Sequence, residues 1–222
     1  MRIKICGLFR EEDMDYVNEA APDYAGFVFA PRSRRHVSPA RAAGLRTKLR
    51  DGIIPVGVFV QSDIETCAAL YRDGIISIIQ LHGGEDPAYI ARLRERCDAP
   101  LIRAVDAGAW EWNAPEKTAA ASRPGKNGGG DSLLTDYLLI DNGKGGSGES
   151  FDWSVLEGFC PPRPWFLAGG IGLHNIDRAL NTAAFALDIS SGAESGGIKD
   201  REKILALTAK VRARRPEEGA KP

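Results

Sequence analysis

The sequence predicts an α/β fold, a single-domain (β/α)8 TIM barrel formed by residues 1–213. Eight short apolar runs recur along the chain, and segments with the amphipathic pattern of helices separate them. Most of these runs are rich in β-branched and aromatic residues, which is typical of parallel strands buried on both faces. The 222 residues suit one compact barrel of this type. An open doubly wound sheet is the alternative, but no Gly-x-Gly-x-x-Gly pattern follows the first expected strand.

Eight strands are expected where these apolar runs end at turn-forming residues. The first run alternates charged and apolar residues, whereas the later runs are almost continuously apolar. The expected strands span residues 2–6, 24–29, 54–60, 75–81, 101–105, 137–141, 165–168 and 185–189.

Six helices are expected between or after these strands, because apolar residues recur there with the helical period of about 3.6 residues. Two of the segments open with a helix-starting pair, Ser38-Pro39 and Asp86-Pro87, in which an N-cap side chain precedes a first-turn proline. The expected helices span residues 11–21, 39–49, 62–72, 86–96, 173–181 and 199–212.

Two segments interrupt the alternation of strands and helices. Residues 114–136 are rich in Lys, Gly, Ala and Ser, so we expect a flexible surface insertion there. Residues 214–222 are charged and contain proline, so we expect a disordered tail. Neither segment predicts a domain boundary, because the strand pattern resumes after the first of them.

The composition predicts a soluble cytoplasmic protein. The 29 basic and 30 acidic residues nearly balance, so nothing favours nucleic acid or a membrane surface as a partner. No apolar run approaches the ~18–20 residues of a membrane span, and the N-terminal residues have the pattern of a strand, not of a signal peptide. The four cysteines lie far apart, which disfavours both a disulfide framework and a zinc site.

Two successive apolar runs within residues 165–192 end in small residues, one in Gly169-Gly170 and the other in Ser191-Gly192. Glycine lets a backbone approach a ligand closely, and free N–H groups at a helix start favour an anion. In parallel barrels the loops after the seventh and eighth strands commonly bind phosphate. We therefore expect these four residues to form a phosphate site rather than two ordinary tight turns.

Polar residues at the ends of three other strands are the candidate reactive groups, because the C-terminal ends of the strands carry the active site in such barrels. Cys6 ends the first strand and is either a small core residue or, beside a cation, a base whose pKa of about 8.5 is readily lowered. Asp141 ends the sixth strand, where partial burial would keep its carboxyl group protonated and able to donate a proton. Arg35 lies in a basic loop after the second strand, and its guanidinium is suited to binding a carboxylate or a phosphate.

Four further polar residues are expected to support this site without reacting. Gln80 and His82 end the fourth strand, and Asp188 lies near the end of the eighth. Lys4 precedes Cys6 by two residues, so both side chains share one face of the first strand. The three histidines of the chain make a poor metal set, so no metal is expected.

Several short motifs, in this order along the chain, resemble those of the phosphoribosylanthranilate isomerase family. The similarity runs from residue 2 to about residue 212 and spares only the insertion. The motifs are residues 4–7 (Lys-Ile-Cys-Gly), 26–29 (Gly-Phe-Val-Phe) with 31–35 (Pro-Arg-Ser-Arg-Arg), 56–60 (Val-Gly-Val-Phe-Val), 79–83 (Ile-Gln-Leu-His-Gly), 145–148 (Gly-Gly-Ser-Gly) with 151–153 (Phe-Asp-Trp), and 187–194 (Leu-Asp-Ile-Ser-Ser-Gly-Ala-Glu).

The resemblance implies an intramolecular oxidoreductase, an aldose–ketose isomerase of tryptophan biosynthesis that uses no cofactor or metal. Its reaction would be the Amadori rearrangement of N-(5-phosphoribosyl)anthranilate to 1-(2-carboxyphenylamino)-1-deoxyribulose 5-phosphate by general acid/base catalysis. By similarity, Asp141 is the acid that opens the ribose ring, Cys6 is the base that takes the proton from the second sugar carbon, and Arg35 binds the anthranilate carboxylate. We expect a monomer or weak homodimer whose partner is this small phosphosugar. The implied phosphate ligands are Gly169, Gly170, Ser191 and Gly192.

Other phosphosugar barrels are the alternatives. An indole-3-glycerol phosphate synthase would use a lysine at a strand end, for which Lys4 is the candidate, and a pentose-phosphate epimerase would need metal-binding histidines. A barrel that binds a phosphorylated ligand without catalysis is disfavoured because both Cys6 and Asp141 are present. The related histidine-pathway isomerisation typically uses two aspartates, so Cys6 argues against it.

Overall fold

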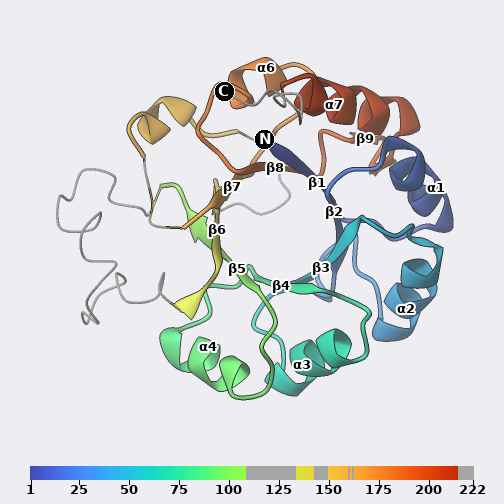
Figure 1. The fold of residues 1–222 in the computed structure, drawn as a ribbon, viewed down its shortest axis with the longest axis vertical. Coiled ribbons are helices and arrows are strands. Elements are labelled where there is room, and N and C mark those ends of the chain that lie inside the picture. The colour runs from blue at the N-terminus through green and yellow to red at the C-terminus, as the bar shows by residue number, and fades with distance from the viewer. Residues whose placement is uncertain (109–133, 143–149, 160, 162, 215–222) are drawn as a thin grey trace, which may run out of the picture.

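Eight parallel strands form a closed barrel, which confirms the predicted fold. The computed structural model describes residues 1–108, 134–142, 150–159, 161 and 163–214. Each strand pairs with the next along the chain, and β8 closes the barrel by pairing with β1. Figure 1 shows the strands as an inner ring and the helices outside it. The strands are β1 (Arg2–Cys6), β2 (Tyr24–Val28), β3 (Ile54–Phe59), β4 (Ile78–Leu81), β5 (Leu101–Asp106), β6 (Tyr137–Asp141), β7 (Trp165–Leu167) and β8 (Ala186–Ile189).

Most of the described helices begin after a side chain that caps their free N–H groups. Ser38 and Asp86 accept hydrogen bonds from the backbones of Arg41 and Tyr89, so both predicted N-caps are confirmed. The segments predicted as an insertion and a tail, residues 114–136 and 214–222, lie almost entirely outside the described residues. The helices are α1 (Glu11–Ala20), α2 (Pro39–Lys48), α3 (Ile64–Arg72), α4 (Pro87–Arg94), the 3₁₀ helix η3 (Trp153–Leu156), α6 (Ile176–Ala179) and α7 (Arg201–Ala213).

Strand β4 starts later than predicted, because the first residues of its apolar run complete helix α3 instead. The N–H groups of Ile75 and Ile76 donate to the carbonyl of Leu70, at 3.1 and 3.3 Å. These bonds satisfy a carbonyl that the helix end would leave free. Pairing with β3 is therefore established only at Ile78.

Helix α6 is much shorter than the predicted helix, because Asn175 belongs to the turn before it. Its side chain accepts a hydrogen bond from the N–H of Gly172 at 2.9 Å and donates to the carbonyl of Gly170 at 3.0 Å. The loop after β7 is thus folded back on itself and held by one amide side chain.

Lys199 was predicted to begin the last helix and lies instead in a small hairpin after β8. The hairpin consists of β9 (Glu194–Ser195) and β10 (Ile198–Lys199), joined through Gly196 and Gly197, whose φ angles are +59° and +87°. Two successive residues with positive φ make a tight turn that glycine adopts readily. Helix α7 then starts after Asp200, which caps it.

Alternation along the strands carries polar side chains into the mouth of the barrel. Each of the strands β4, β6 and β8 carries a polar residue two positions after an inward-facing apolar residue. These polar residues are Gln80, Asp141 and Asp188, respectively. On β1, Lys4 and Cys6 share the inward face, as their spacing predicted. The apolar layer beneath these polar residues contains Tyr24, Val56, Ile78, Ile102, Leu139, Phe166, Ala168 and Ala186.

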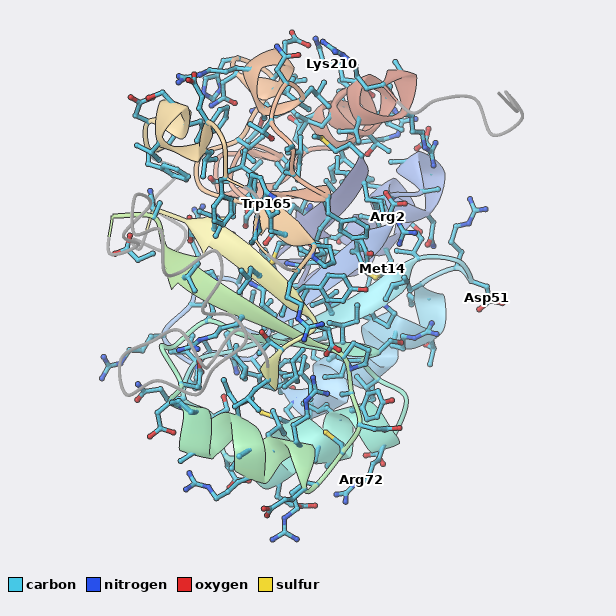
Figure 2. The ribbon with its side chains drawn as sticks, turned by 60° about the vertical axis from the view of Figure 1, so that its left-hand side comes forward. Arg2, Met14, Asp51, Arg72, Trp165 and Lys210 are labelled. Carbon is cyan, nitrogen blue, oxygen red and sulfur yellow. The ribbon has the colours of Figure 1, made fainter. Side chains whose placement is uncertain are left out.

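A second, larger apolar layer lies between the strands and the helices. Met14 of α1 and Trp165 of β7 belong to it, whereas Arg72 and Lys210 lie at the outer surface (Figure 2). In the part of the chain that the structure describes, no helix is long and apolar enough to cross a membrane.

We expect the free energy of unfolding to fall as the pH rises above about 9. Burial raises the pKa of the Cys6, Cys67, Tyr24 and Tyr89 side chains, that of Cys67 from 9.0 to about 11. A group with a raised native pKa loses its proton first in the unfolded chain, so stability is full below the unfolded pKa and is lost above it. The test is denaturant unfolding at several pH values between 8 and 11.

The Cys67→Ala variant isolates one of these groups. A shift of one pKa unit corresponds to about 1.4 kcal/mol. Between pH 8 and 11 the free energy of unfolding of the variant should therefore fall by about 2 kcal/mol less than that of the wild type. Equal losses in the two proteins would show that the Cys67 thiol does not contribute.

Candidate active site

A cavity of about 190 Å3 lies at the C-terminal ends of the strands. Nine of the eleven predicted site residues line it; Lys4 and Gly192 lie directly behind its wall. The lining also includes an apolar wall formed by side chains of β2 and β3 and of the loops that follow them. The lining residues are Cys6, Val28, Ala30, Ser33, Arg35, Val58, Val60, Gln80, His82, Asp141, Asn142, Ala168, Gly169, Gly170, Ile171, Asp188, Ser190 and Ser191.

Cys6 ends β1 with its side chain in the cavity and only 7% of its surface exposed. A Cβ at Gly26 would lie 2.8 Å from the Cys6 sulfur, so a glycine on β2 makes room for the thiol. Burial raises the pKa of this thiol, and the Lys4 ammonium opposes the rise without cancelling it. We expected a lowered pKa from a neighbouring cation; in the structure desolvation outweighs that cation.

Lys4 and Asp188 form a buried ion pair beside Cys6. The two residues are partners in the β1–β8 register, and the Lys4 ammonium lies 3.0 Å from both carboxylate oxygens. Burial disfavours the ammonium, but Asp188 and Cys6 together raise the pKa of Lys4 above its usual value. Lys4 is thus held charged by its partner and does not line the cavity, which argues against a catalytic role of the synthase type.

Asp141 ends β6 and has a polar partner at each carboxylate oxygen, with 6% of its surface exposed. The N–H of Asn142 donates to Oδ1 at 2.8 Å, and Nε2 of His82 lies 3.2 Å from Oδ2. The other ring nitrogen of His82 lies 3.0 Å from the amide nitrogen of Gln80. His82 therefore links the side chains of Gln80 and Asp141 at the mouth of the barrel.

Arg35 is 5% exposed and is fixed at both ends of its side chain. Gly7, with φ of +80°, lies so close to the stem that a Cβ there would stand 2.3 Å from Cδ of Arg35. At the other end, Nε and Nη2 donate to the two carboxylate oxygens of Glu194, at 2.6 and 3.0 Å. Among the described residues, none accepts a hydrogen bond from its Nη1 atom.

The two loops predicted to bind phosphate lie against each other. Gly172 and Gly192 form a bridge between them, and a Cβ at Gly192 would stand 1.9 Å from the carbonyl oxygen of Ile171. Gly169 and Gly170 have φ angles of +85° and +63°. Within the described part of the chain, neither of these two glycines donates its N–H to a hydrogen bond. Free N–H groups of successive turn residues form a concave site suited to an anion.

Glu194 and Lys199 are polar residues near the cavity to which the sequence analysis gave no role. Both are buried, and the Lys199 ammonium lies 2.6 Å from the Glu194 carboxylate and donates to the carbonyl of Ser190 at 3.0 Å. Burial lowers the pKa of Lys199, against the opposing attraction of Glu194. Glu194 ends one of the motifs quoted above, but no pattern in the sequence links it to Lys199 because strands of two residues show no periodicity.

Comparison with known sequences identifies the family of this chain. The family model described as "N-(5'phosphoribosyl)anthranilate (PRA) isomerase" matches residues 3–210. A protein of Endomicrobium trichonymphae named N-(5'-phosphoribosyl)anthranilate isomerase is 40% identical over 217 residues, covering 96% of this chain and 98% of its own length. A protein of the same name from Lactiplantibacillus plantarum is 40% identical over 211 residues, covering 95% of this chain and 91% of its own length.

Solved structures agree in fold. The phosphoribosyl anthranilate isomerase of Thermus thermophilus superimposes with a TM-score of 0.79 at 31% identity, over 97% of this chain and 100% of that chain. A phosphoribosyl anthranilate isomerase in complex with reduced 1-(o-carboxyphenylamino)-1-deoxyribulose 5-phosphate superimposes with a TM-score of 0.73 at 28% identity. The superposition covers 96% of this chain and 99% of that chain.

Proposed function

This chain belongs to the N-(5'-phosphoribosyl)anthranilate isomerase family and is the tryptophan-biosynthesis isomerase of that name, and we propose that the cavity described above is its active site. Its reaction is the Amadori rearrangement of N-(5-phosphoribosyl)anthranilate to 1-(2-carboxyphenylamino)-1-deoxyribulose 5-phosphate. The observation that carries the proposal is that Cys6, Arg35 and Asp141, from three different parts of the chain, line one cavity beside two glycine loops. The test is turnover of freshly generated substrate, followed by its fluorescence, in wild-type and substituted proteins.

In the first step, Asp141 acts as the general acid. Its carboxyl proton passes to the ribose ring oxygen while the bond from that oxygen to the first sugar carbon breaks. The anthranilate nitrogen supplies its lone pair and becomes a protonated imine. The carboxylate left on Asp141 is then stabilised by the N–H of Asn142, and Nε2 of His82 lies beside its other oxygen.

In the second step, Cys6 acts as the general base. Its thiolate takes the proton from the second sugar carbon, and the electrons of that C–H bond neutralise the imine to give an enolamine, which tautomerises to the ketone. The ammonium groups of Lys4 and Lys199 stabilise the thiolate. Because the pKa of Cys6 is raised, the thiol must first give its proton to solvent, and the thiolate so formed is a stronger base than an ordinary one. Both steps redistribute protons and electrons within the substrate, so the proposed mechanism is an intramolecular oxidation and reduction without a cofactor.

The remaining parts of the cavity would hold the two ends of the substrate. The Nη1 side of Arg35 suits the anthranilate carboxylate, and Val28, Val58 and Val60 offer an apolar wall to the aromatic ring. The free N–H groups of Gly169 and Gly170 suit the phosphate, together with Ser191 and Gly192. Binding both ends would hold the first two sugar carbons between Asp141 and Cys6.

We propose that the protein works in the cytoplasm as a monomer or weak homodimer. Cys6, Cys67 and Cys97 are free thiols, which suits a reducing compartment. Few large apolar side chains are exposed in the described part of the chain, and they come from separate loops and short elements: Val60, Val155, Leu173 and Ile198. A related isomerase from Thermotoga maritima is described as dimeric. Light scattering across a concentration series measures the state of this protein.

Replacing Gly192 with alanine should raise KM by about 5- to 160-fold, because overpacking a close contact forces backbone shifts that cost about 1–3 kcal/mol. The new Cβ would stand 1.9 Å from the Ile171 carbonyl, so the two phosphate loops must move apart. The measurement is KM for the substrate together with the inhibition constant of inorganic phosphate. Gly44→Ala is the matched control, because a Cβ at Gly44 in α2 meets no atom within 4 Å. An unchanged phosphate affinity in Gly192→Ala would contradict the proposed phosphate site.

A further inference from the structure

We propose that Glu194 is a positioning residue that aims Arg35 at the carboxylate of the substrate. This inference rests on the proposed function, in which Arg35 binds that carboxylate. Glu194 lies in β9, 159 residues along the chain from Arg35, and its carboxylate is buried against the guanidinium.

The geometry of the contact leaves one edge of Arg35 free. A guanidinium presents two edges with paired donors, one formed by Nε and Nη2 and the other by Nη1 and Nη2. Glu194 occupies the first edge, at 2.6 and 3.0 Å. A carboxylate of the substrate can therefore be bound by two donors only at the second edge. Rotation of the guanidinium about its stem would break both bonds to Glu194, so Glu194 fixes the direction of the free edge.

Glu194 does not cancel the charge of the site, because it is shared among three cations. Arg34 donates to its Oε2 at 2.7 Å, and Lys199 donates to its Oε1 at 2.6 Å, in addition to the two bonds from Arg35. The buried members of this cluster, Arg35, Lys199 and Glu194, carry a net charge of +1, since two positive charges face one negative charge. An excess of positive charge remains for an anionic ligand.

Glu194 is itself rigidly held. The carbonyl of Glu194 accepts a hydrogen bond from the Lys203 ammonium at 2.6 Å, and its side chain is locked to Lys199 of the neighbouring strand β10. Lys199 in turn donates to the carbonyl of Ser190, next to the phosphate loop. A side chain ordered before binding loses little entropy on binding, which raises affinity for the ligand group that it contacts.

The test uses two ligands that differ only in the group that Arg35 would bind. One is reduced 1-(o-carboxyphenylamino)-1-deoxyribulose 5-phosphate, and the other is the same molecule without its ring carboxylate. Glu194→Gln should weaken binding of the first about tenfold and change binding of the second by less than about twofold. In turnover, KM should rise about tenfold while kcat changes by less than about threefold.

Glu194→Asp covers the case in which the glutamine variant does not fold. It keeps the negative charge among the three cations but is one methylene shorter, so it withdraws from Arg35 and should show the same selective loss. Arg34→Gln is the matched control, since Arg34 also contacts Glu194 but is exposed and does not line the cavity. It should leave both affinities within about twofold of the wild type.

The outcomes separate this inference from the function on which it rests. Equal weakening of both ligands by either Glu194 variant would overturn the positioning role, because Glu194 would then support only the loop. No change with either ligand would overturn it as well. Wild-type protein that binds neither ligand, or an Arg35→Gln variant that keeps the wild-type preference for the carboxylated ligand, would instead contradict the proposed carboxylate site.

Discussion

The Asp141→Asn variant should retain its fold and lose most of its activity, with kcat lowered about 10²–10⁴-fold, the range for removal of a general acid. Asparagine has nearly the same shape, and its carbonyl can still accept the bond from the Asn142 N–H. It has no carboxyl proton to give to the ribose ring oxygen, so ring opening would depend on water. The measurement is substrate turnover by fluorescence, with circular dichroism as the check on folding.

Asp106→Asn makes the same chemical change on the neighbouring strand. Asp106 is the partner of Asp141 in the β5–β6 register, but it caps the N–H of Gly108 and does not line the cavity. This control should keep kcat within about twofold of the wild type, because it removes no group that touches the substrate. An Asp141→Asn protein as active as the wild type would rule out Asp141 as the acid.

The barrel and the mouth of its site were predictable from the sequence, because both depend on local patterns. A strand buried on both faces appears as an apolar run, and the residue at which the run stops lies at the C-terminal edge of the sheet. Cys6 and Asp141 were found in this way, and the structure places both in one cavity. Glycines that end such runs pointed in the same manner to the two loops around Gly170 and Gly192, which the structure brings together.

The contacts that organise the site were not predictable, because they join distant residues without periodicity. The sequence indicated a cation at Arg35 but not the carboxylate that faces it 159 residues later. Lys199 was assigned to a helix because it precedes an amphipathic segment, whereas two glycines turn it back onto Glu194. The direction of a pKa shift also depends on burial. A cation beside Cys6 suggested a lowered pKa for its thiol, but desolvation of the thiol raises that pKa.

The Cys6→Ser variant should lower kcat about 10²–10⁴-fold while changing KM by less than about threefold, because Cys6 is used in the transition state more than in binding. The serine hydroxyl is close in size and fits the space that Gly26 leaves for the sulfur. It holds its proton at every pH at which the protein is folded, so it cannot take a proton from the second sugar carbon. Ring opening by Asp141 would remain possible, and the substrate should accumulate as the opened imine.

Deuterium at the second sugar carbon makes this prediction specific to the proton-transfer step. In Cys6→Ser that step should limit turnover, so the deuterated substrate should react several times more slowly than the ordinary one. Cys97→Ser is the control, since Cys97 lies beyond helix α4, bonded to the carbonyl of Leu93, and should change neither kcat nor the isotope effect. If Cys6→Ser turned over as fast as the wild type, the proton at the second carbon would have to be taken by another group. Asp188 would then be the first to consider, because it lines the same cavity beside Cys6.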